Sequence, residues 1–411
     1  MIRKLAFLFV FAASAALAIG QSFALHSGDR VVFYGDSITD NQPYTYDAET
    51  FVTLRYPKLH VSYMNAGVGG DRVTGGWMGP IDQRMTRDLF SRKPTVITIM
   101  LGMNDASYTP FRQDILDTYE NGYNHMADRI QKEAPDARVW LFQPSPFDDV
   151  TRKPNWDPGY NDVLKKYAAF VAQLADQRHF SVVDQNTPMD DMLEKADAMN
   201  PDEAQKLIPD RIHPGPAGHL VMTDQLLQAW HASPLVSVTK IDWRAGTGTS
   251  ENADLGPIKN GTFTLLEHSL PYPFDRKDGQ TQLVLACSTV AQDMNTETLQ
   301  VDNMPQGTFS LSIDGKQVGS FSTADFAAGI DLSKLDTPMI EQAQKVQDMT
   351  NQIGNLRYNR WRQLEFNLQD YDLPQRKNAI KAVENLESAL EDVRYKDAQP
   401  VSHTFQITQT G

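Results

Sequence analysis

The chain has 411 residues, a length that predicts two or three structural units at about 150 residues per domain. Hydrophobic residues make up 41% and charged residues 22%, which is typical of a folded globular protein and argues against disorder. The formal net charge of −14 argues against nucleic acid or anionic lipid as a partner, because both carry negative charge.

The beginning of the chain has the features of a signal peptide. Two basic residues precede an apolar run over residues 5–18, which is too short to span a bilayer comfortably. Two A-x-A-like cleavage sites are present, at residues 16–18, where the run ends, and at residues 22–24. We therefore expect residues 1–24 to be removed on export, leaving a periplasmic or extracellular protein without a stable membrane anchor. An uncleaved anchor is the alternative.

Between Arg30 and Trp230 the chain alternates short apolar runs with amphipathic stretches. The apolar runs predict strands, and the amphipathic stretches predict helices. Strands that are apolar on both faces indicate a parallel sheet covered by helices on both sides, and hence a doubly wound α/β fold. We expect strands at 30–34, 61–65, 95–101, 138–142 and 180–184, and helices at 113–132 and 161–177.

The pattern changes after Trp230. Residues 233–331 are rich in Thr, Gly and alternating apolar residues, and Asp314-Gly315 between two apolar runs predicts a β-hairpin. We therefore predict a small β module in this region. The expected units are a signal peptide at 1–24, an α/β domain at 25–232, the β module at 233–331, and a helical extension with a terminal strand at 332–411.

The helical extension has two periodic stretches, at about 337–369 and 375–392, and residues 401–410 are expected to return to the β module as a strand. A basic and aromatic cluster lies on the first stretch. We expect it to pack on the β module with its arginines paired to acidic neighbours, and a docking surface is the alternative. The cluster consists of Arg357, Tyr358, Arg360, Trp361 and Arg362.

The sequence contains one cysteine, Cys287, so no intramolecular disulfide and no cysteine-built zinc or iron–sulfur site is expected. Cys287 ends the apolar run 283–287, which we interpret as a buried strand. The sequence has no H-E-x-x-H motif, no P-loop and no G-x-S-x-G elbow. We expect neither a metal nor another cofactor.

Residues suited to nucleophilic catalysis follow the predicted strands. Ser37 comes directly after the first strand in a G-D-S tripeptide, where a helix N-terminus would supply N–H donors and a positive dipole. Taken alone, such a serine is more often a helix cap. The second strand leads into a glycine-rich turn at 67–70, where the N–H of Gly70 is a candidate oxyanion donor. Asn104 follows the third strand and offers an amide donor, although a turn asparagine is the alternative.

The last loop of the α/β domain supplies an acid and a base. Asp210 and His213 lie three residues apart, so the carboxylate can accept a hydrogen bond from one imidazole nitrogen and fix the tautomer. The other nitrogen would then take a proton from Ser37. His219 is interpreted as a supporting or helix residue. Because parallel strands present their carboxyl ends at one edge of a sheet, we expect these loops to converge.

These blocks resemble the SGNH, or GDSL, hydrolase superfamily over residues 28–231. The motifs occur in the family's order: G-D-S, a glycine before aspartate, G-x-N-D and D-x-x-H. The resemblance implies a flavodoxin-like three-layer α/β/α sandwich, here with a C-terminal β module and helical segment. It implies catalytic roles for Ser37, His213 and Asp210, and an oxyanion hole formed by Ser37, Gly70 and Asn104.

The expected activity is that of a serine esterase acting through an acyl-enzyme on a small-molecule or polysaccharide ester. Export, an acidic surface and a β module suit short acetyl esters on carbohydrates. Four aromatic residues near the expected mouth are candidates for stacking on sugar rings, although ordinary packing is the alternative for each. They are Tyr44, Tyr46, Trp77 and Trp156.

Two other functions remain open at this point. One is a lipid-directed esterase or lysophospholipase, in which four apolar residues before Asp210 would line an acyl groove, although core packing explains them equally well. These residues are Met189, Met192, Leu193 and Met199. The other is a non-catalytic glycan-binding or scaffold protein with a vestigial hydrolase fold. The complete set of polar residues argues against this last possibility.

Overall fold

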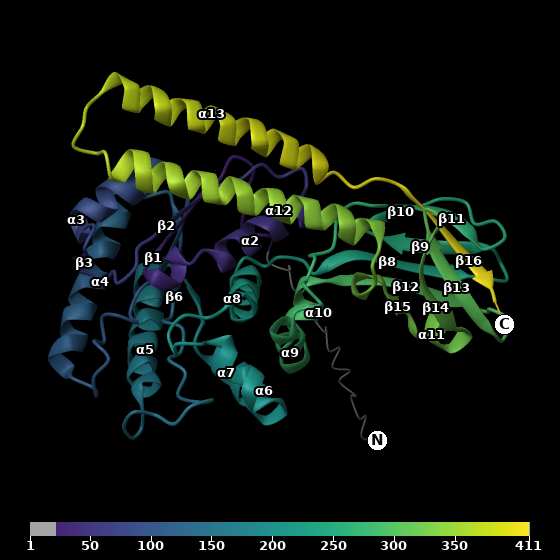
Figure 1. The fold of residues 1–411 in the computed structure, drawn as a ribbon, viewed down its shortest axis with the longest axis horizontal. Coiled ribbons are helices and arrows are strands. Elements are labelled where there is room, and N and C mark those ends of the chain that lie inside the picture. The colour runs from purple at the N-terminus through teal and green to yellow at the C-terminus, as the bar shows by residue number, and fades with distance from the viewer. Residues whose placement is uncertain (1–21, 411) are drawn as a thin grey trace, which may run out of the picture.

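A computed structural model describes residues 22–410, so most of the expected signal peptide lies outside the described residues. The first unit is built on a five-stranded sheet in the order β2-β1-β5-β6-β7, and every neighbouring pair is parallel (Figure 1). The five predicted strands are confirmed. They are β1 (Arg30–Gly35), β2 (Ser62–Gly67), β5 (Val96–Met100), β6 (Arg138–Phe142) and β7 (Ser181–Val183).

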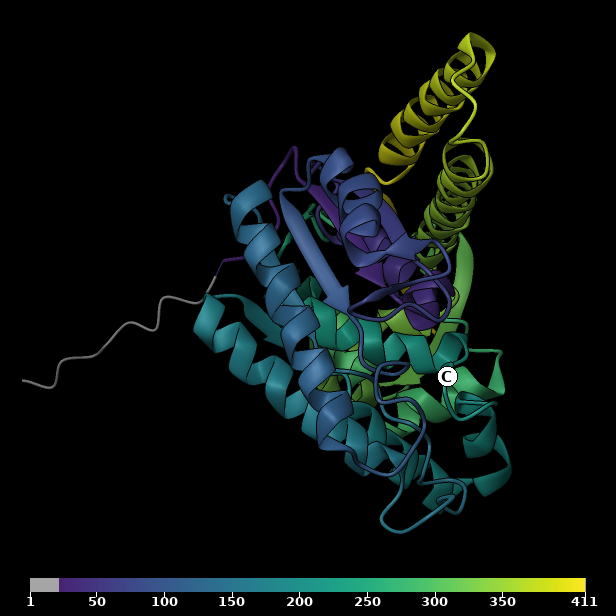
Figure 2. The same cartoon turned by 90° about the vertical axis from the view of Figure 1, so that its left-hand side faces the viewer.

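Helices cover both faces of this sheet, which confirms the three-layer α/β/α architecture (Figure 2). On one face α2 (Pro43–Arg55) packs beside α8 (Pro216–Ala229), and on the other α4 (Gln113–Glu133) packs beside α5 (Tyr160–Arg178). The remaining elements of this unit are α1 (Ser37–Asp40), β3 (Gly75–Gly76), β4 (Gly79–Pro80), α3 (Ile81–Arg84), η1 (Met85–Leu89), η2 (Phe90–Arg92), α6 (Thr187–Met199) and α7 (Pro201–Leu207).

Two further sheets follow and share a second apolar core. One has the order β15-β12-β8-β9 and the other β10-β11-β16-β13-β14. The hairpin predicted at Asp314-Gly315 is confirmed, with φ of 51° and 80° at the two turn residues. The strands are β8 (Leu235–Asp242), β9 (Thr247–Glu251), β10 (Ala253–Leu255), β11 (Thr262–Glu267), β12 (Thr296–Asp302), β13 (Thr308–Ile313), β14 (Lys316–Ser322), β15 (Ile330–Asp331) and β16 (His403–Gln409), with α11 (Thr323–Ala328) and η3 (Leu332–Lys334) between them.

The strand predicted around Cys287 is wrong. Residues Gly279–Cys287 form helix α9, and α10 (Val290–Met294) follows it. The side chain of Asp278 caps α9 by accepting a hydrogen bond from the N–H of Thr281 at 2.7 Å. A five-residue apolar run does not distinguish a buried helix from a buried strand. Here the N-cap residue Asp278 favours the helix. Cys287 is buried, as expected, but within the core of the α/β unit.

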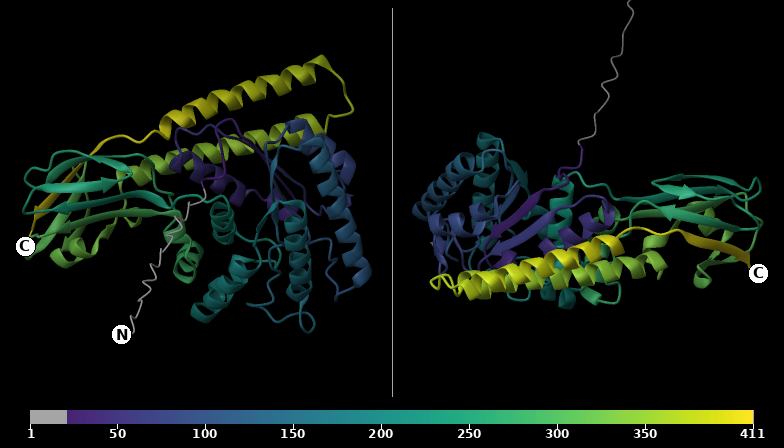
Figure 3. Two further views of the ribbon diagram at one scale, coloured as in Figure 1. Left: turned by 180° about the vertical axis from the view of Figure 1, so that it is seen from behind. Right: turned by 90° about the horizontal axis from the view of Figure 1, so that it is seen from above.

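The C-terminal helices were predicted in the right places, and α12 (Pro338–Asn359) continues into the π-helix η4 (Arg360–Phe366) before α13 (Pro374–Asp397). The two long helices lie side by side along the molecule, from the α/β unit to the β sheets (Figures 1 and 3). Among the helices of residues 22–410, none has the length and apolar character that crossing a membrane requires.

The expected partner of the basic and aromatic cluster is wrong. The arginines are paired with acids, as predicted, but the cluster packs on the α/β unit and not on the β module. Arg357 and Arg394 both bind the buried carboxylate of Glu49 on α2, with 3.1 Å between Arg357 Nη1 and Glu49 Oε2. A helix face that carries both charge and aromatic surface does not specify its partner, so tertiary packing decided it.

Candidate active site

Ser37 lies at the carboxyl end of β1 and is the first residue of α1. The cap of this short helix is Asp36, whose Oδ1 accepts a hydrogen bond from the N–H of Ile38 at 3.0 Å. The interpretation of Ser37 as the helix cap is therefore wrong, because the neighbouring aspartate fills that place. The hydroxyl of Ser37 is left to a different partner.

That partner is His213. The distance from Ser37 Oγ to His213 Nε2 is 2.8 Å, and His213 Nδ1 lies 2.6 Å from Asp210 Oδ2. The other oxygen of Asp210 accepts hydrogen bonds from the N–H groups of His213 and Ile212. Partial burial raises the pKa of Asp210, but these hydrogen bonds outweigh it and hold the pKa below its usual value. The ionised carboxylate can thus orient and stabilise the imidazole.

Arg211 anchors the loop between this acid and this base, and sequence reasoning missed it. Its Nη2 lies 2.6 Å from Asp149 Oδ1, and its Nε donates to the carbonyl of Asp148 at 2.8 Å. The guanidinium also lies over the Phe147 ring, 4.6 Å from its centroid. Because these partners follow β6, the loop that carries His213 is tied to the same edge of the sheet.

The glycine-rich turn after β2 has one N–H group available for a ligand. The N–H of Gly67 donates to Asn65 Oδ1 at 2.9 Å, and the N–H of Gly69 donates to Asp40 Oδ2 at 3.0 Å. Gly70 has a φ of +76° and donates to no acceptor within residues 22–410. A positive φ favours glycine at this position. Of the three glycines weighed from the sequence, Gly70 is thus the one suited to be an oxyanion donor.

Asn104 lies beside this turn with its amide held in one orientation. Its Oδ1 accepts a hydrogen bond from the Tyr108 hydroxyl at 3.1 Å, and its Nδ2 donates to the carbonyl of Asp71 at 3.1 Å. The same Nδ2 lies 3.5 Å from Asp36 Oδ2. The amide nitrogen therefore faces the space between the Ser37 loop and the Gly70 turn, where an oxyanion donor is needed.

A buried cluster of ion pairs holds the residues on both sides of the Gly67–Gly70 turn. Arg84 is fully buried and lies 2.9 Å from Asp71 and 2.5 Å from Asp88, while its Nη2 donates to the carbonyl of Ala66 at 3.0 Å. Burial raises the pKa of Asp71 despite the attraction of Arg84. Breaking such a buried pair by removing one partner is strongly destabilising. Nothing in the local sequence marks Arg84 for this role, because its partners lie on three different elements.

Burial raises the pKa of two carboxyls near the serine well above the usual value. Burial, with only partial compensation from hydrogen bonds, raises the pKa of Asp36 to about 8 and that of Asp105 to about 7. An uncharged Asp36 beside Asn104 would avoid repelling a negative oxygen bound there.

The C-terminal extension contributes to the same site. From η4, Arg362 Nη2 donates to Asp40 Oδ1 at 2.7 Å and to the carbonyl of Gly67 at 3.0 Å. The hydroxyl of Tyr358 also donates to Asp40 Oδ1, at 2.6 Å. Since Asp40 accepts the N–H of Gly69, two side chains from the far end of the sequence, Tyr358 and Arg362, help to hold the Gly67–Gly70 turn.

The aromatic candidates for sugar stacking have different positions. Tyr44 is wholly buried and stacks on His219, which is itself a buried structural residue whose pKa burial lowers to about 3. Trp156 is half-buried and meets Tyr160 edge to face. Trp77 is exposed, and its Nε1 donates to the carbonyl of Gly69 at 3.0 Å, so it stands beside the candidate site.

The residues considered for an acyl groove belong mostly to the core. Met189, Met192 and Leu193 are buried in the main apolar core, and Met199 is exposed at the end of α6. Core packing, which was one of the two interpretations of these residues, accounts for the first three.

Comparison with known proteins decides the family of this unit. The model of the GDSL-like lipase/acylhydrolase family matches residues 33–221. The chain carries a GDSL-like lipase/acylhydrolase domain. The GDSL domain contains all five predicted site residues, and the family makes the protein an ester-hydrolysing enzyme.

Several individual proteins are similar to this chain. An acetylxylan esterase of Geobacillus stearothermophilus is 24% identical over 49% of this chain and 94% of its own length. A crystal structure of an acetylxylan esterase from the same organism covers 50% of this chain and 96% of its own, with a TM-score of 0.41. The structure of a gut microbial diltiazem-metabolizing enzyme, also 24% identical, covers 94% of this chain and 98% of its own, with a TM-score of 0.82. The fold outside the GDSL domain therefore recurs in that protein.

Proposed function

We propose that the protein is a serine esterase that removes short acyl groups, chiefly acetyl, from carbohydrates. One observation carries the catalytic part of the proposal: Ser37 Oγ, the His213 imidazole and the Asp210 carboxylate form a continuous hydrogen-bonded series with distances of 2.8 and 2.6 Å. Asp210 fixes the tautomer in which Nε2 of His213 accepts a proton from the serine hydroxyl.

The reaction follows from this geometry. His213 takes the proton of Ser37 as its Oγ attacks the ester carbonyl, and the negative oxygen that forms is stabilised by the N–H groups of Ser37 and Gly70 and by Asn104 Nδ2. The imidazolium of His213 then protonates the leaving alcohol as the acyl-enzyme forms. Water attacks the acyl-enzyme with His213 again acting as base, and the carboxylic acid and free Ser37 are released.

The carbohydrate part of the proposal is supported by the relative that is named as an acetylxylan esterase. Met189, Met192 and Leu193 lie in the core, so these three residues do not supply the acyl groove that the lipid alternative would need.

Fluorophosphonate labelling tests the nucleophile. The folded protein should be labelled at Ser37, and Ser37→Ala should abolish the label and lower kcat for p-nitrophenyl acetate by roughly 10⁴-fold or more. A folded wild-type protein that takes no label is instead a non-catalytic protein of this fold. For the substrate, acetyl release from acetylated xylan is compared with hydrolysis of p-nitrophenyl esters of increasing length. A preference for chains of eight or more carbons would contradict the acetylesterase proposal.

Export is proposed from the sequence of residues 1–24, and the structure favours one of the two cleavage sites. Phe23 stacks on Tyr56 with 4.0 Å between ring centroids, and the N–H of Ala24 donates to the carbonyl of Trp230 at 2.8 Å. Cleavage after Ala24 would remove both contacts. We therefore expect N-terminal sequencing of the exported protein to begin at Ile19, and a mature chain beginning at Leu25 would contradict this.

A further inference from the structure

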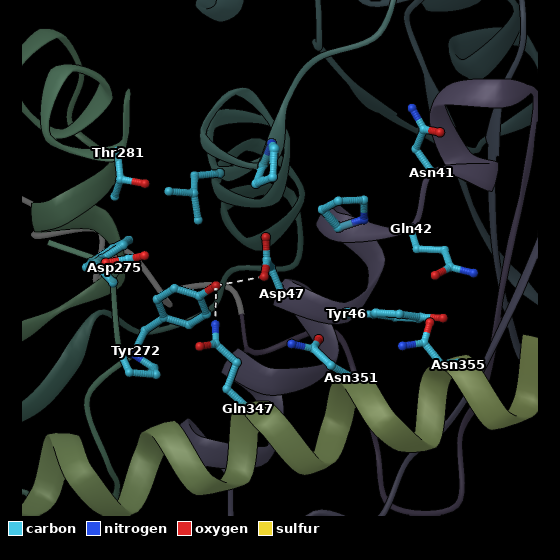
Figure 4. Close-up of a pocket in the computed structure, with 15 residues that line it drawn as sticks. Asn41, Gln42, Tyr46, Asp47, Tyr272, Asp275, Thr281, Gln347, Asn351 and Asn355 are labelled. Atoms are coloured by element: carbon cyan, nitrogen blue, oxygen red, sulfur yellow. Dashed lines mark hydrogen bonds between the residues drawn. The ribbon is translucent and has the colours of Figure 1, made fainter. Parts of the chain in front are cut away.

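A pocket outside the catalytic triad lies where four parts of the chain meet (Figure 4). Its volume is about 410 Å³. One wall comes from α2 and the loop before it, the opposite wall from residues 272–281, and the floor from α12. Pro216 and Leu220 of α8 complete the lining. It is not part of the GDSL domain alone, because α12 and residues 272–281 lie beyond the region that the family model matches.

Amide side chains dominate the polar lining. Gln347, Asn351 and Asn355 are spaced four residues apart on α12, so they share the helix face that borders the pocket. Gln347 donates to the Tyr272 hydroxyl at 3.0 Å. Within residues 22–410, the side chains of Asn351 and Asn355 have no hydrogen-bond partner, and the same holds for Asn41 on the opposite wall. Each primary amide offers two donors and one acceptor group to a ligand.

Tyr46 provides a second and independent sign of a ligand. Its side chain is 7% exposed and lines the pocket, yet its hydroxyl has no partner among the described residues. Buried polar groups without a partner are rare, and each calls for an explanation such as a ligand or ordered water. The ring packs tightly on Gly354, where a Cβ atom would lie 2.5 Å from the ring. The position of the hydroxyl is thus fixed by the helix that carries the amides.

The charge of the pocket lining indicates which class of ligand the pocket can bind. No Lys, Arg or His lines the pocket, and its two ionisable acids are Asp47 and Asp275. Asp47 accepts a hydrogen bond from Tyr272 at 2.8 Å. Such a wall disfavours phosphate and carboxylate groups, and its many donors and acceptors disfavour an acyl chain. A ligand with neutral hydroxyl groups can form hydrogen bonds with the amides of the pocket. If it also has flat apolar ring faces, these can pack on the aromatic side chains.

The pocket adjoins the catalytic residues. Asn41 on its rim ends the helix that starts at Ser37, and its N–H donates to the Ser37 carbonyl at 2.9 Å. On the other side, Pro216 follows His213 by three residues. The row of amides on α12 continues at Tyr358 and Arg362, which bind Asp40. The pocket and the row on α12 thus border the short helix α1 that begins at Ser37.

We propose that this pocket binds neutral sugar units of an oligosaccharide next to the esterified unit, so that the C-terminal extension selects glycan esters. The proposal rests on ester hydrolysis at Ser37. It assigns binding to Asn351, Asn355 and Tyr46, none of which takes part in bond making or breaking.

Steady-state kinetics with a glycan ester and with a small ester without sugar units test the proposal. In Asn351→Ala/Asn355→Ala, KM for acetylated xylo-oligosaccharides should rise roughly tenfold, the effect of losing two or three hydrogen bonds. The kcat/KM for p-nitrophenyl acetate should stay within about twofold, as expected for surface substitutions. Gln352→Ala is the matched control, because Gln352 is an exposed amide of α12 outside the pocket, and it should leave both values unchanged. Equal KM values in the double variant and the control overturn the proposal.

Binding without turnover separates this proposal from the catalytic one. Full-length Ser37→Ala protein is titrated calorimetrically with unesterified xylo-, cello- and manno-hexaose and with decanoate. Binding of at least one hexaose, weakened about tenfold in Ser37→Ala/Asn351→Ala/Asn355→Ala, supports the proposal. Binding of none of the three, or of decanoate alone, overturns it. If wild-type protein does not hydrolyse p-nitrophenyl acetate, the proposed function fails, and the titration still decides whether the pocket binds sugars.

Discussion

At the scale of single residues, the amide of Asn104 is oriented by Tyr108 and by the carbonyl of Asp71. We predict that Asn104→Ala lowers kcat by about 10²–10³, because one oxyanion donor is lost while substrate binding is kept. Tyr108→Phe should cost only a few-fold, since it removes the orienting hydroxyl and leaves the amide. Steady-state kinetics with p-nitrophenyl acetate measures both. A large rise in KM with unchanged kcat in Asn104→Ala would assign the amide to ground-state binding instead.

A second prediction concerns Asp105, whose Oδ1 accepts the N–H of Val73 at 2.9 Å. Burial raises the pKa of Asp105 to about 7, so the folded protein binds this proton more tightly than the unfolded chain does. Its contribution to stability is therefore full below about pH 4 and is lost as pH rises towards 7. Over this range the free energy of unfolding of Asp105→Asn should therefore fall less steeply with pH than that of the wild type, by up to about 1.4 kcal/mol per pH unit.

Chemical denaturation between pH 4 and 8 measures this effect. Asp114→Asn is the control, because Asp114 is exposed and its ion pair with Arg112 lowers its pKa. An Asp105→Asn protein whose stability falls with pH as steeply as the wild type would contradict the prediction.

At the scale of elements, η4 is connected to the catalytic turn through Arg362, which binds both Asp40 and the carbonyl of Gly67. Arg362→Gln keeps a donor but cannot reach both acceptors as the guanidinium does. We expect kcat for p-nitrophenyl acetate to fall roughly tenfold, because a slightly misplaced donor costs transition-state stabilisation. The KM should change little.

The control for this substitution is Arg112→Gln, which removes an exposed ion pair that makes no hydrogen bond to Asp40 or to the Gly67–Gly70 turn. Loss of activity that merely follows a lower melting temperature, and recovers on cooling, would assign Arg362 to stability alone. An unchanged kcat in a stable Arg362→Gln protein would show that the Gly67–Gly70 turn does not need η4.

At the scale of the whole molecule, the last strand, β16, completes a sheet whose first strand, β10, begins at Ala253. β16 lies between β11 and β13, and Phe405 stacks on Phe263 with 5.2 Å between ring centroids. Deleting residues 401–411 would split this sheet into two hairpin-like pairs and give β11 and β13 each a free edge. We expect much lower soluble yield and an earlier unfolding transition of the β sheets, measured by thermal circular dichroism. A truncated protein that unfolds at the wild-type temperature would contradict this.

The sequence alone predicted the elements whose signals are local. The parallel strands are continuous apolar runs, and Asp314-Gly315 is a two-residue turn that needs positive φ, so these could be read in sequence order. The proposed catalytic residues could also be found in the sequence, because Ser37, Asn104, Asp210 and His213 follow strands or lie on one short loop. Their convergence follows from the rule that parallel strands end at one edge.

Tertiary structure decided everything that depends on partners far apart in the chain. The run at 283–287 is a helix because of its cap and its place in the core, and the arginines of α12 found Glu49 on α2. Likewise, only the fold joins Arg362 to the Gly67 turn and Asn351 to the pocket beside Ser37. The physical reason is that an apolar run or a charged face specifies that it must be covered or paired, but not by which segment. The sequence by itself therefore determined the chemistry of the site, and the tertiary structure determined what supports and surrounds it.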